Sequence, residues 1–262
     1  WWLQMVSRLL ATGVRPGKVV GLDQATLESM LLPPQPGRSG DLSKTNQKRS
    51  APPQGLAPLL EAIARHDPDR LRHSLAHAQW RMGLAAFVTE VVAPLAAEVG
   101  QAWAQGRFEI FEEHLFTEVV TGVLRQAIGS LTRPAPPGGP KVLLTTLPSE
   151  MHGLGLLMVE SLLSLEGCAC VSLGTQTPVG DVARAAQAHQ ADVVALSFSD
   201  VHQGKRVWTP LSQLRALLPA PVAIWAGGSC SALQRGALPG ITVLQDLSAL
   251  RSEVAQWRSA LP

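Results

Sequence analysis

Cysteine is scarce in this sequence, and its pattern excludes two classes of protein. The 262 residues include three cysteines, Cys168, Cys170 and Cys230. Their number is odd and they lack the paired spacing of a zinc site, so neither a disulfide-stapled secreted domain nor a zinc module is favoured. We expect small buried thiols in a reducing cytoplasm.

Long apolar runs and a leader sequence are also lacking. No uninterrupted apolar run approaches the length of about 20 residues that spans a bilayer, so we expect a cytoplasmic protein with no membrane partner. The opening residues, WWLQMVSRLL, lack the basic start and long apolar core of a signal peptide. The chain begins with Trp1 rather than Met, and we therefore expect it to be part of a longer protein.

The net charge is small, and a nucleotide fingerprint is missing. A formal charge of +2 argues neither for nor against nucleic acid as a partner. No GxGxxG follows the first predicted strand, which disfavours a dinucleotide-binding fold. Length and an apolar content of 46% allow two domains, each with its own core.

Composition divides the chain into five segments. Residues 1–32 are predicted to form two short helices, and residues 33–54 a flexible linker rich in proline and scattered basic residues. Residues 55–132 are predicted to be a helical bundle, residues 133–140 (RPAPPGGP) a second linker, and residues 141–262 an α/β domain.

Apolar residues recur at three- and four-residue steps through residues 55–132, which predicts a four-helix bundle. Asp67 is the expected cap of the second helix, and Pro94 is expected to kink the third. The predicted helices span residues 56–65, 68–82, 84–103 and 108–131.

Strand and helix patterns alternate after residue 140, which predicts a parallel sheet with helices on both faces. The order resembles the flavodoxin-like (Rossmann-like) five-strand arrangement. The predicted strands are 141–147, 169–173, 192–197, 222–226 and 241–244, and the predicted helices are 153–165, 178–189, 210–217, 229–235 and 247–260.

The stretch KVLLTTLPSEMHGLG, residues 141–155, reads as strand, loop and helix start. Open α/β sheets place their ligands at such a carboxyl end of a strand. His152 is a possible metal ligand, and Glu150 is a carboxylate that can fix its tautomer. Gly155 lets the start of the helix approach a bound group closely.

Small residues end two later strands. Ser197 and Ser199 close ADVVALSFS, and the pair Gly227–Gly228 closes PVAIWAGG. Together with Glu150-x-His152-x-x-Gly155, this set resembles the cobalamin-binding domain, whose pattern is Asp-x-His-x-x-Gly, Ser-x-Leu and Gly-Gly. The resemblance implies cobalamin with its dimethylbenzimidazole tail in a slot and His152 on cobalt. Glu150 replaces the usual Asp, and Ser199 replaces the usual Leu, which is expected to make one slot wall more polar.

A second motif lies in the helical segment. Trp103 is followed, after nine residues, by Glu113 and His114. Trp-x9-Glu-His resembles the light-sensing cobalamin regulators of the CarH type. The resemblance implies that Trp103 shields the upper axial group, with Glu113 and His114 making polar contacts near it. In that family a histidine directly follows the tryptophan, but here the position is Ala104.

The opening segment, SRLLATGVRPGKVVGLDQATLESML, resembles the end of the winged-helix DNA-binding domain of MerR-type regulators. The combined resemblance implies a transcriptional regulator rather than an enzyme, with adenosylcobalamin or methylcobalamin as cofactor. Operator DNA and a homo-oligomer, dimer or tetramer, are the expected partners. The alternatives are a corrinoid protein that carries methyl groups for a methyltransferase, and an antirepressor-like cobalamin sensor that acts through a protein partner.

The remaining histidines carry weaker signals. His73 and His77 stand four residues apart on one predicted helix, a spacing that can bind a metal, but no third ligand is suggested and a solvated helix face is favoured. His202 lies in a predicted loop after the third strand, where it either lines the cofactor mouth or faces solvent.

Overall fold

The computed structural model describes residues 55–131, 139–199 and 205–260. The predictions for residues 1–54, most of the second linker and His202 lie outside these residues. Within the described chain, residues up to Leu71 and Leu95–Phe116 form one compact unit, and Arg72–Pro94 with the residues from Thr117 onward form a second.

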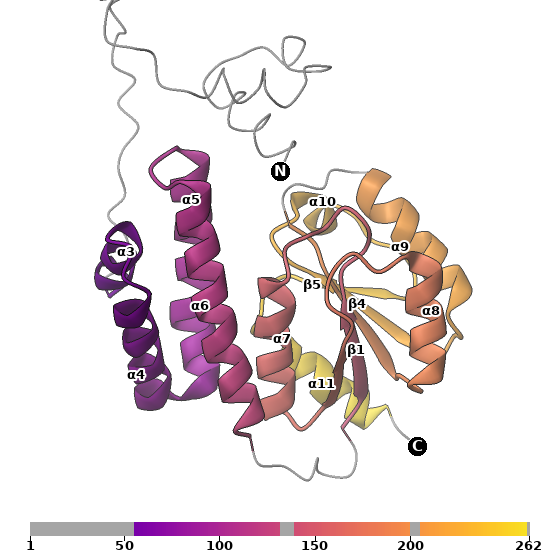
Figure 1. Cartoon of the computed structure of the whole chain (residues 1–262). Coiled ribbons are helices and arrows are strands. Elements are labelled where there is room, and N and C mark those ends of the chain that lie inside the picture. The colour runs from indigo at the N-terminus through magenta and orange to yellow at the C-terminus, as the bar shows by residue number, and fades with distance from the viewer. Residues whose placement is uncertain (1–54, 132–138, 200–204, 261–262) are drawn as a thin grey trace, which may run out of the picture. The chain divides into compact units, whose positions relative to one another are not determined.

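Within residues 55–131, four α-helices and one π-helical turn precede the sheet, where the sequence predicted four helices (Figure 1). Asp67 caps α4 as expected, because its Oδ1 accepts a hydrogen bond from the backbone N–H of Arg70 at 2.9 Å. Gly83, with φ of +79°, interrupts α4 where the sequence predicted the boundary between two helices. The elements are α3 (Ala57–Ala64), α4 (Pro68–Ala86), the π-helical turn η2 (Phe87–Val92), α5 (Ala93–Ala104) and α6 (Ile110–Gly129).

The π-helical turn η2 replaces the simple kink expected at Pro94. The N–H of Ala93 donates to the carbonyl of Val88, five residues earlier. Proline has no N–H, and its ring would crowd the carbonyl four residues before it in a regular helix. A wider turn just ahead of Pro94 relieves this crowding, and such π-bulges are frequent at functional sites.

The first unit has its own apolar core and a polar contact between the α3–α4 turn and α6. His66 Nε2 lies 3.1 Å from Oε1 of the buried Glu112, and the His66 ring packs edge-on against Phe111. Oε2 of Glu112 also accepts the backbone N–H of Glu109 at 2.7 Å, which caps α6. The buried apolar side chains of this unit are Leu56, Leu59, Ala62, Ile63, Leu71, Leu95, Val99, Ala102, Phe108 and Phe116.

The second unit contains a five-stranded parallel sheet in the order β2-β1-β3-β4-β5, the predicted flavodoxin-like arrangement. Five helices, α7 to α11, connect or follow the strands. The strands are β1 (Lys141–Thr145), β2 (Ala169–Ser172), β3 (Val193–Ser197), β4 (Ala223–Gly227) and β5 (Ile241–Leu244). The helices are α7 (Leu154–Leu165), α8 (Val179–Ala188), α9 (Lys205–Leu217), α10 (Ser231–Gln234) and α11 (Ala249–Ser259).

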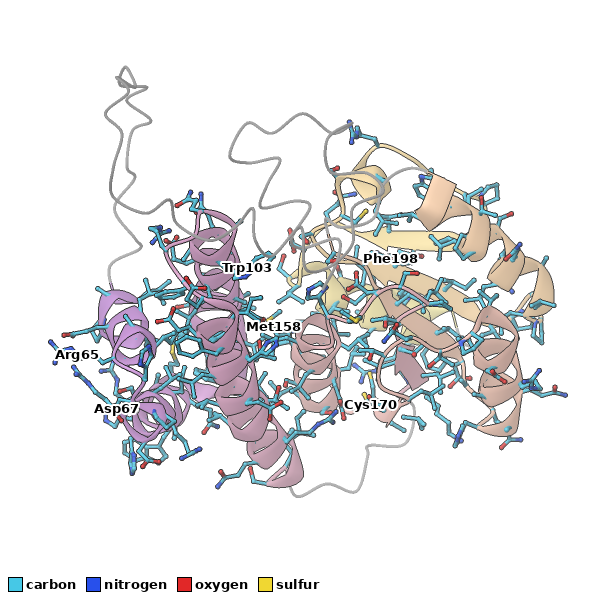
Figure 2. All side chains as sticks on the ribbon, turned by 45° about the horizontal axis from the view of Figure 1, so that its top comes forward. Arg65, Asp67, Trp103, Met158, Cys170 and Phe198 are labelled. Atoms are coloured by element: carbon cyan, nitrogen blue, oxygen red, sulfur yellow. The ribbon has the colours of Figure 1, made fainter. Side chains whose placement is uncertain are left out.

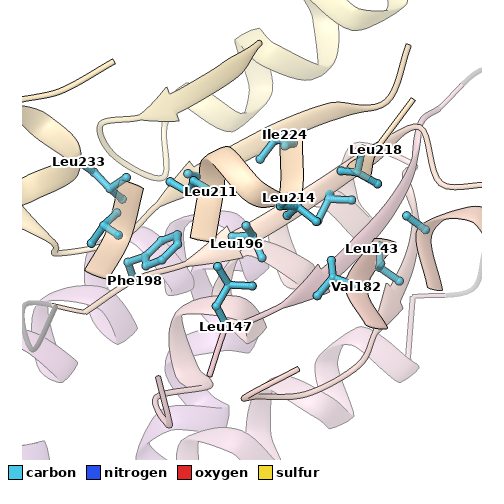
Figure 3. Close-up of a cluster of buried hydrophobic side chains, with 14 of the residues drawn as sticks. Leu143, Leu147, Val182, Leu196, Phe198, Leu211, Leu214, Leu218, Ile224 and Leu233 are labelled. Atoms are coloured by element: carbon cyan, nitrogen blue, oxygen red, sulfur yellow. The ribbon is translucent and has the colours of Figure 1, made fainter. Parts of the chain in front are cut away.

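Two apolar clusters sandwich the sheet. One cluster joins β1, β3 and β4 to α8, α9 and α10, and Figure 3 shows its leucines and Phe198 gathered around Leu196. The other joins the opposite faces of these strands to α7 and α11 and contains Trp225. Strands buried on both faces are typical of parallel sheets, and this explains the continuous apolar runs in the sequence.

Helix α9 begins five residues earlier than predicted. Pro210 was expected at its start, but the helix runs from Lys205 and Pro210 lies inside it. Val207, in the added turn, is fully buried and Trp208 packs against the same cluster. This burial offsets the hydrogen bond that a proline inside a helix cannot make.

One helical stretch, Pro68–Ala104, is long and apolar enough to cross a membrane by length and composition alone, which the sequence analysis did not anticipate. A core helix of a soluble protein passes the same test. Gly83 breaks this stretch, and its large apolar side chains Phe87, Val92, Leu95 and Val99 are buried against protein. We therefore interpret it as two bundle helices in sequence.

An ion pair joins α6 to α7 inside the second unit. Arg125 Nη1 donates to Glu160 Oε2 at 2.8 Å, and the Glu160 side chain is only 11% exposed. Replacing Arg125 with Ala leaves a desolvated carboxylate without this donor, so we expect a loss of about 1–3 kcal/mol in unfolding free energy. Urea denaturation of the apoprotein measures it. Adding Glu160→Gln should recover part of the loss, and an Arg125→Ala protein as stable as the parent would contradict the expectation.

Candidate functional site

A tight turn after β1 aims Glu150 into the protein. Ser149 adopts a left-handed conformation with φ of +75°, and the N–H of Glu150 donates to the carbonyl of Leu147 at 3.1 Å. Non-glycine residues seldom adopt this region, and such strain is concentrated at functional sites. As a result, Glu150 is 1% exposed although it lies in a loop.

Glu150 links the loops that follow β1 and β3. Its Oε1 accepts hydrogen bonds from the backbone N–H of His152 at 2.9 Å and from Nδ1 of the His152 ring at 2.6 Å. Its Oε2 accepts from both the backbone N–H and the hydroxyl of Ser199, each at 2.7 Å. Each carboxylate oxygen accepts two hydrogen bonds, so the carboxylate is fixed in place and in turn fixes the orientation of the imidazole.

The charge state of Glu150 determines the tautomer of His152. Burial raises the pKa of Glu150, but the hydrogen bonds from His152 and Ser199 lower it by more, to about 2. An ionised carboxylate only accepts hydrogen bonds, so Nδ1 of His152 carries a proton. In the neutral ring Nε2 is then the nitrogen with a lone pair, the form in which histidine ligates a metal.

A second set of hydrogen bonds fixes the backbone of the same loop. The Thr146 hydroxyl donates to the carbonyl of Glu150 at 2.6 Å and accepts the N–H of Gln176 at 2.8 Å. Thr146 is fully buried. The loop is therefore tied to the segment after β2 as well as to the loop after β3, and it is held before any ligand arrives.

This loop lies where β1 and β3 are neighbours but the chain leaves them in different directions, to β2 after β1 and to β4 after β3. Such a switch point opens a crevice beyond the carboxyl ends of the strands, the usual ligand site of open α/β sheets. Directly beside it, between the sheet end, α7, α11 and η2, is a cavity of about 430 Å³. The cavity lies entirely within the second unit.

Four of the predicted residues line this cavity: Gly155, Ser197, Gly227 and Gly228. Apolar side chains form most of the remaining wall, including Met158 on α7, which Figure 2 labels. Sequence reasoning did not single out the other lining residues. These are Thr89, Ala93, Leu156, Met158, Val159, Ala195, Leu196, Trp225, Leu244, Asp246, Leu247, Ser248 and Leu250.

Two glycines are required by close approach. A Cβ on Gly155 would lie 2.7 Å from the Ser197 hydroxyl, so the start of α7 packs directly on the end of β3. Gly228 has φ of +120°, and a Cβ there would collide with the carbonyl oxygen of Phe198. These contacts explain why glycine stands at both positions on the cavity wall.

Ser199 differs from its expected role. It was predicted to make one slot wall more polar, but it is not among the residues that line the cavity, and its hydroxyl donates to Glu150 instead. The spacing in the sequence already places Ser199 two residues beyond the strand end Ser197, in the loop rather than at the strand end. The structure adds that Phe198, between these two serines, is buried in the core.

The helical motif lies in the first unit. Trp103, labelled in Figure 2, is half-buried near the end of α5. Helix α6 begins at Ile110 rather than at the expected residue 108, so Glu113 ends its first turn and His114 begins the second. His114 Nδ1 lies 2.7 Å from Glu113 Oε2. His152 and the cavity belong to the second unit, and a joint role of the two motifs stays a prediction.

The other candidate groups do not form a metal site. Among the described residues no group of three or more His, Cys, Asp or Glu side chains could hold a metal ion, and this includes the neighbourhood of the His73–His77 pair. The three cysteines all lie within the described residues, and none of them is in a disulfide. Burial and the adjacent Cys168 raise the pKa of Cys170 to about 12, so it stays protonated.

Two family models match the chain, and both are described as a B12 binding domain. One matches residues 56–128, the helical segment, and the other matches residues 140–244, the sheet segment with the site. The matched regions contain Trp103, Glu113 and His114 in the first case and all the sheet-domain candidates in the second. The helical stretch that passes the length test for a membrane span lies inside the first match.

The chain is also similar to characterised proteins. It is 30% identical over 174 residues to the HTH-type transcriptional repressor CarH and 32% identical over 162 residues to the HTH-type transcriptional repressor CarA, both of Myxococcus xanthus. These matches cover 66% and 62% of this chain but only 57% and 54% of the relatives, so the chain spans just over half their length.

A solved structure has the same fold. The monomethylamine corrinoid protein of Methanosarcina barkeri superposes with a TM-score of 0.58, at 14% identity, over 76% of this chain and 95% of that one. At this identity the likeness concerns the fold alone. The two matching family models show that the chain contains two B12 binding domains, one helical and one built on a parallel sheet, and the chain is similar to the repressors CarH and CarA.

Proposed function

We propose that the second unit binds cobalamin with its tail base displaced from cobalt and with Nε2 of His152 in its place. The observation that carries this proposal is the hydrogen-bonded series Ser199–Glu150–His152 at the switch point of the sheet. Metal-binding histidines typically donate their other ring nitrogen to a carboxylate that is itself hydrogen-bonded. Glu150 meets both conditions through contacts of 2.6–2.7 Å.

The neighbouring cavity fits the displaced tail. Its wall is mainly apolar, and Gly155, Ser197 and Gly227 leave open the space that larger side chains would fill. A flat heteroaromatic base gains from burial in such a slot. The residues that hold the cofactor are therefore His152, with Glu150 and Ser199 behind it, and the wall residues Gly155, Ser197, Gly227 and Gly228.

We further propose that the chain is part of a cytoplasmic transcriptional regulator that senses light through adenosylcobalamin. When bound, this cofactor supplies a cobalt–carbon bond that visible light breaks. Trp103 would cover the upper axial group, with Glu113 and His114 beside it. Loss of that group would alter the helical segment and, through it, oligomerisation and affinity for operator DNA, as in a two-state protein biased by a ligand.

The similarity to two proteins named as transcriptional repressors supports a regulator over an enzyme. DNA binding would reside in a domain preceding the bundle, and the homo-oligomer would be a dimer or tetramer. The alternatives are methylcobalamin as the natural cofactor, a methyl-carrying corrinoid protein, and a sensor that acts through a protein partner.

The experiment compares the protein loaded with adenosylcobalamin in the dark and after green light. We expect a spectral change on illumination together with a smaller assembly by size-exclusion chromatography. A loaded protein whose assembly state and operator binding are the same before and after light, at several concentrations, would contradict light sensing. Cofactor-dependent methyl transfer by the same protein would then favour the corrinoid-carrier alternative.

The hydroxyl of Ser199 should matter for cofactor affinity. Ser199→Ala keeps the backbone N–H bond to Glu150 Oε2 but removes the hydroxyl bond at 2.7 Å, so the carboxylate is held less firmly. We expect cobalamin to bind about 10-fold more weakly, since loss of a group that supports a metal ligand typically costs 10–100-fold. Absorbance titration measures this. The exposed Ser229 offers a matched control, Ser229→Ala, which should bind like the parent; equal affinity in Ser199→Ala would show that the backbone bond suffices.

A further inference from the structure

The cavity beside His152 has a floor made by a large aromatic residue. Ser197 on β3, Gly227 on β4 and Leu244 on β5 are register neighbours at the ends of their strands. Ser197 and Gly227 carry small side chains or none, and both line the cavity. One step deeper on the same face of the sheet, Ala195 pairs with Trp225. The pair Ser197–Gly227 thus leaves space open at the carboxyl end of the sheet. Trp225 fills the space over the same face two residues earlier in β4.

Trp225 is fixed in that place. It is 2% exposed, and it belongs to the apolar cluster between the sheet and the helices α7 and α11. Its neighbour Ala195 is small, which leaves room for the indole beside it. The side chains of Leu156 and Leu250 come from the two helices and belong to the same cluster. An indole packed on several sides has little freedom to move when a ligand enters.

We propose that Trp225 sets the depth of the cavity and thereby selects cobamides by the size of their tail base. This inference rests on the proposed cobalamin function and names the class of cofactor: corrinoids whose tail is a two-ring heteroaromatic base. A base of that size lies over the Ser197–Gly227 row and meets the indole at its inner end. A base with a third fused ring collides with the indole and cannot enter while His152 binds cobalt.

The first test uses the unaltered protein and three corrinoids in their hydroxo or aquo forms, titrated in the dark by absorbance. The probes are cobalamin, a cobamide with a naphthimidazole tail, and cobinamide, which has no tail. We expect the naphthimidazole form to bind no more tightly than cobinamide, and cobalamin to bind at least about 10-fold more tightly than both, a ratio ordinary for a shape-selective apolar pocket. If the naphthimidazole form binds as tightly as cobalamin, the inference is overturned.

The second test shortens the floor with Trp225→Phe. We expect weaker binding of cobalamin, an unchanged affinity for cobinamide, and a gain of about 10-fold in the affinity for the naphthimidazole form relative to cobalamin. Trp208→Phe is the matched control, because Trp208 packs in the cluster on the other face of the sheet and does not line the cavity. Its tail selectivity should equal that of the parent.

The two tests separate this inference from the proposed function. If the parent binds none of the three corrinoids, the cobalamin proposal itself fails. If the parent binds cobalamin and Trp225→Phe leaves the ratio of naphthimidazole form to cobalamin unchanged, only the depth assignment is overturned. A Trp225→Phe protein that does not fold leaves the comparison of three probes in the parent as the deciding measurement.

Discussion

Replacing His152 with Ala should weaken cobalamin binding by about 100-fold or more and should leave the tail base on cobalt in whatever cofactor still binds. The imidazole is the only group of the Ser199–Glu150–His152 series with a nitrogen that can ligate cobalt. Losing a group that merely supports a ligand costs 10–100-fold, so losing the ligand itself should cost at least as much. Absorbance titration with hydroxocobalamin gives the affinity, and the band positions report the lower ligand.

The fold should survive this change, because the His152 side chain is 46% exposed. Thermal melting of the apoprotein checks that point. His189→Ala is the matched control, since His189 is an exposed histidine at the C-terminal end of α8. It lies shortly before the start of β3 at Val193, and therefore near the amino ends of the strands rather than near the carboxyl ends, where the site is. His189→Ala should bind like the parent. A His152→Ala protein with the parent's affinity and spectrum would show that His152 is not the cobalt ligand.

Replacing Gly155 with Leu should abolish high-affinity cofactor binding while preserving the folded apoprotein. The added Cβ points at the Ser197 hydroxyl, 2.7 Å away, and the rest of the side chain has the cavity beside it. Leucine is a better helix former than glycine by roughly 0.8 kcal/mol, which offsets part of the crowding. We therefore expect cobalamin affinity to fall by about 100-fold, the discrimination that steric exclusion from an apolar pocket can provide.

Gly180→Leu controls for the helix effect. Gly180 is the second residue of α8, as Gly155 is of α7, and a Cβ on Gly180 meets only an arginine side-chain nitrogen at 3.8 Å. This variant should gain helix propensity without losing cofactor. Cobinamide extends the comparison, because a corrinoid without a tail should bind Gly155→Leu nearly as well as it binds the parent. Equal loss of cobinamide and cobalamin would mean that Gly155→Leu disturbs His152 rather than the slot.

Much of this site could be predicted from residue types at the ends of apolar runs. Glu150, His152 and Gly155 follow the first strand, and Gly227 and Gly228 end the fourth; a parallel sheet brings such ends to one edge. The order of the strands was predicted by resemblance. Periodicity shows which residues are buried but does not show which strands are neighbours.

The features that sequence analysis missed depend on tertiary packing. Pro210 reads as a helix start, but burial of Val207 and Trp208 extends α9 beyond it. The π-helical turn before Pro94 is a local response to the proline ring, and the sequence indicates a distortion there but not its form. Trp225 reads as one more apolar residue in a strand. It becomes the floor of a cavity only because its register neighbour is the small Ala195 and because the next pair on the same face, Ser197–Gly227, has almost no side-chain volume.

The most direct test of the central claim is an electron paramagnetic resonance spectrum of the cobalt(II) form bound to the protein. A single axial nitrogen splits the cobalt lines into triplets when it is nitrogen-14 and into doublets when it is nitrogen-15. We predict that protein made with nitrogen-15 histidine shows doublets with unlabelled cobalamin, and that His152→Ala loses them. Triplets that persist in the labelled protein would place the cofactor's own base on cobalt and would contradict the account.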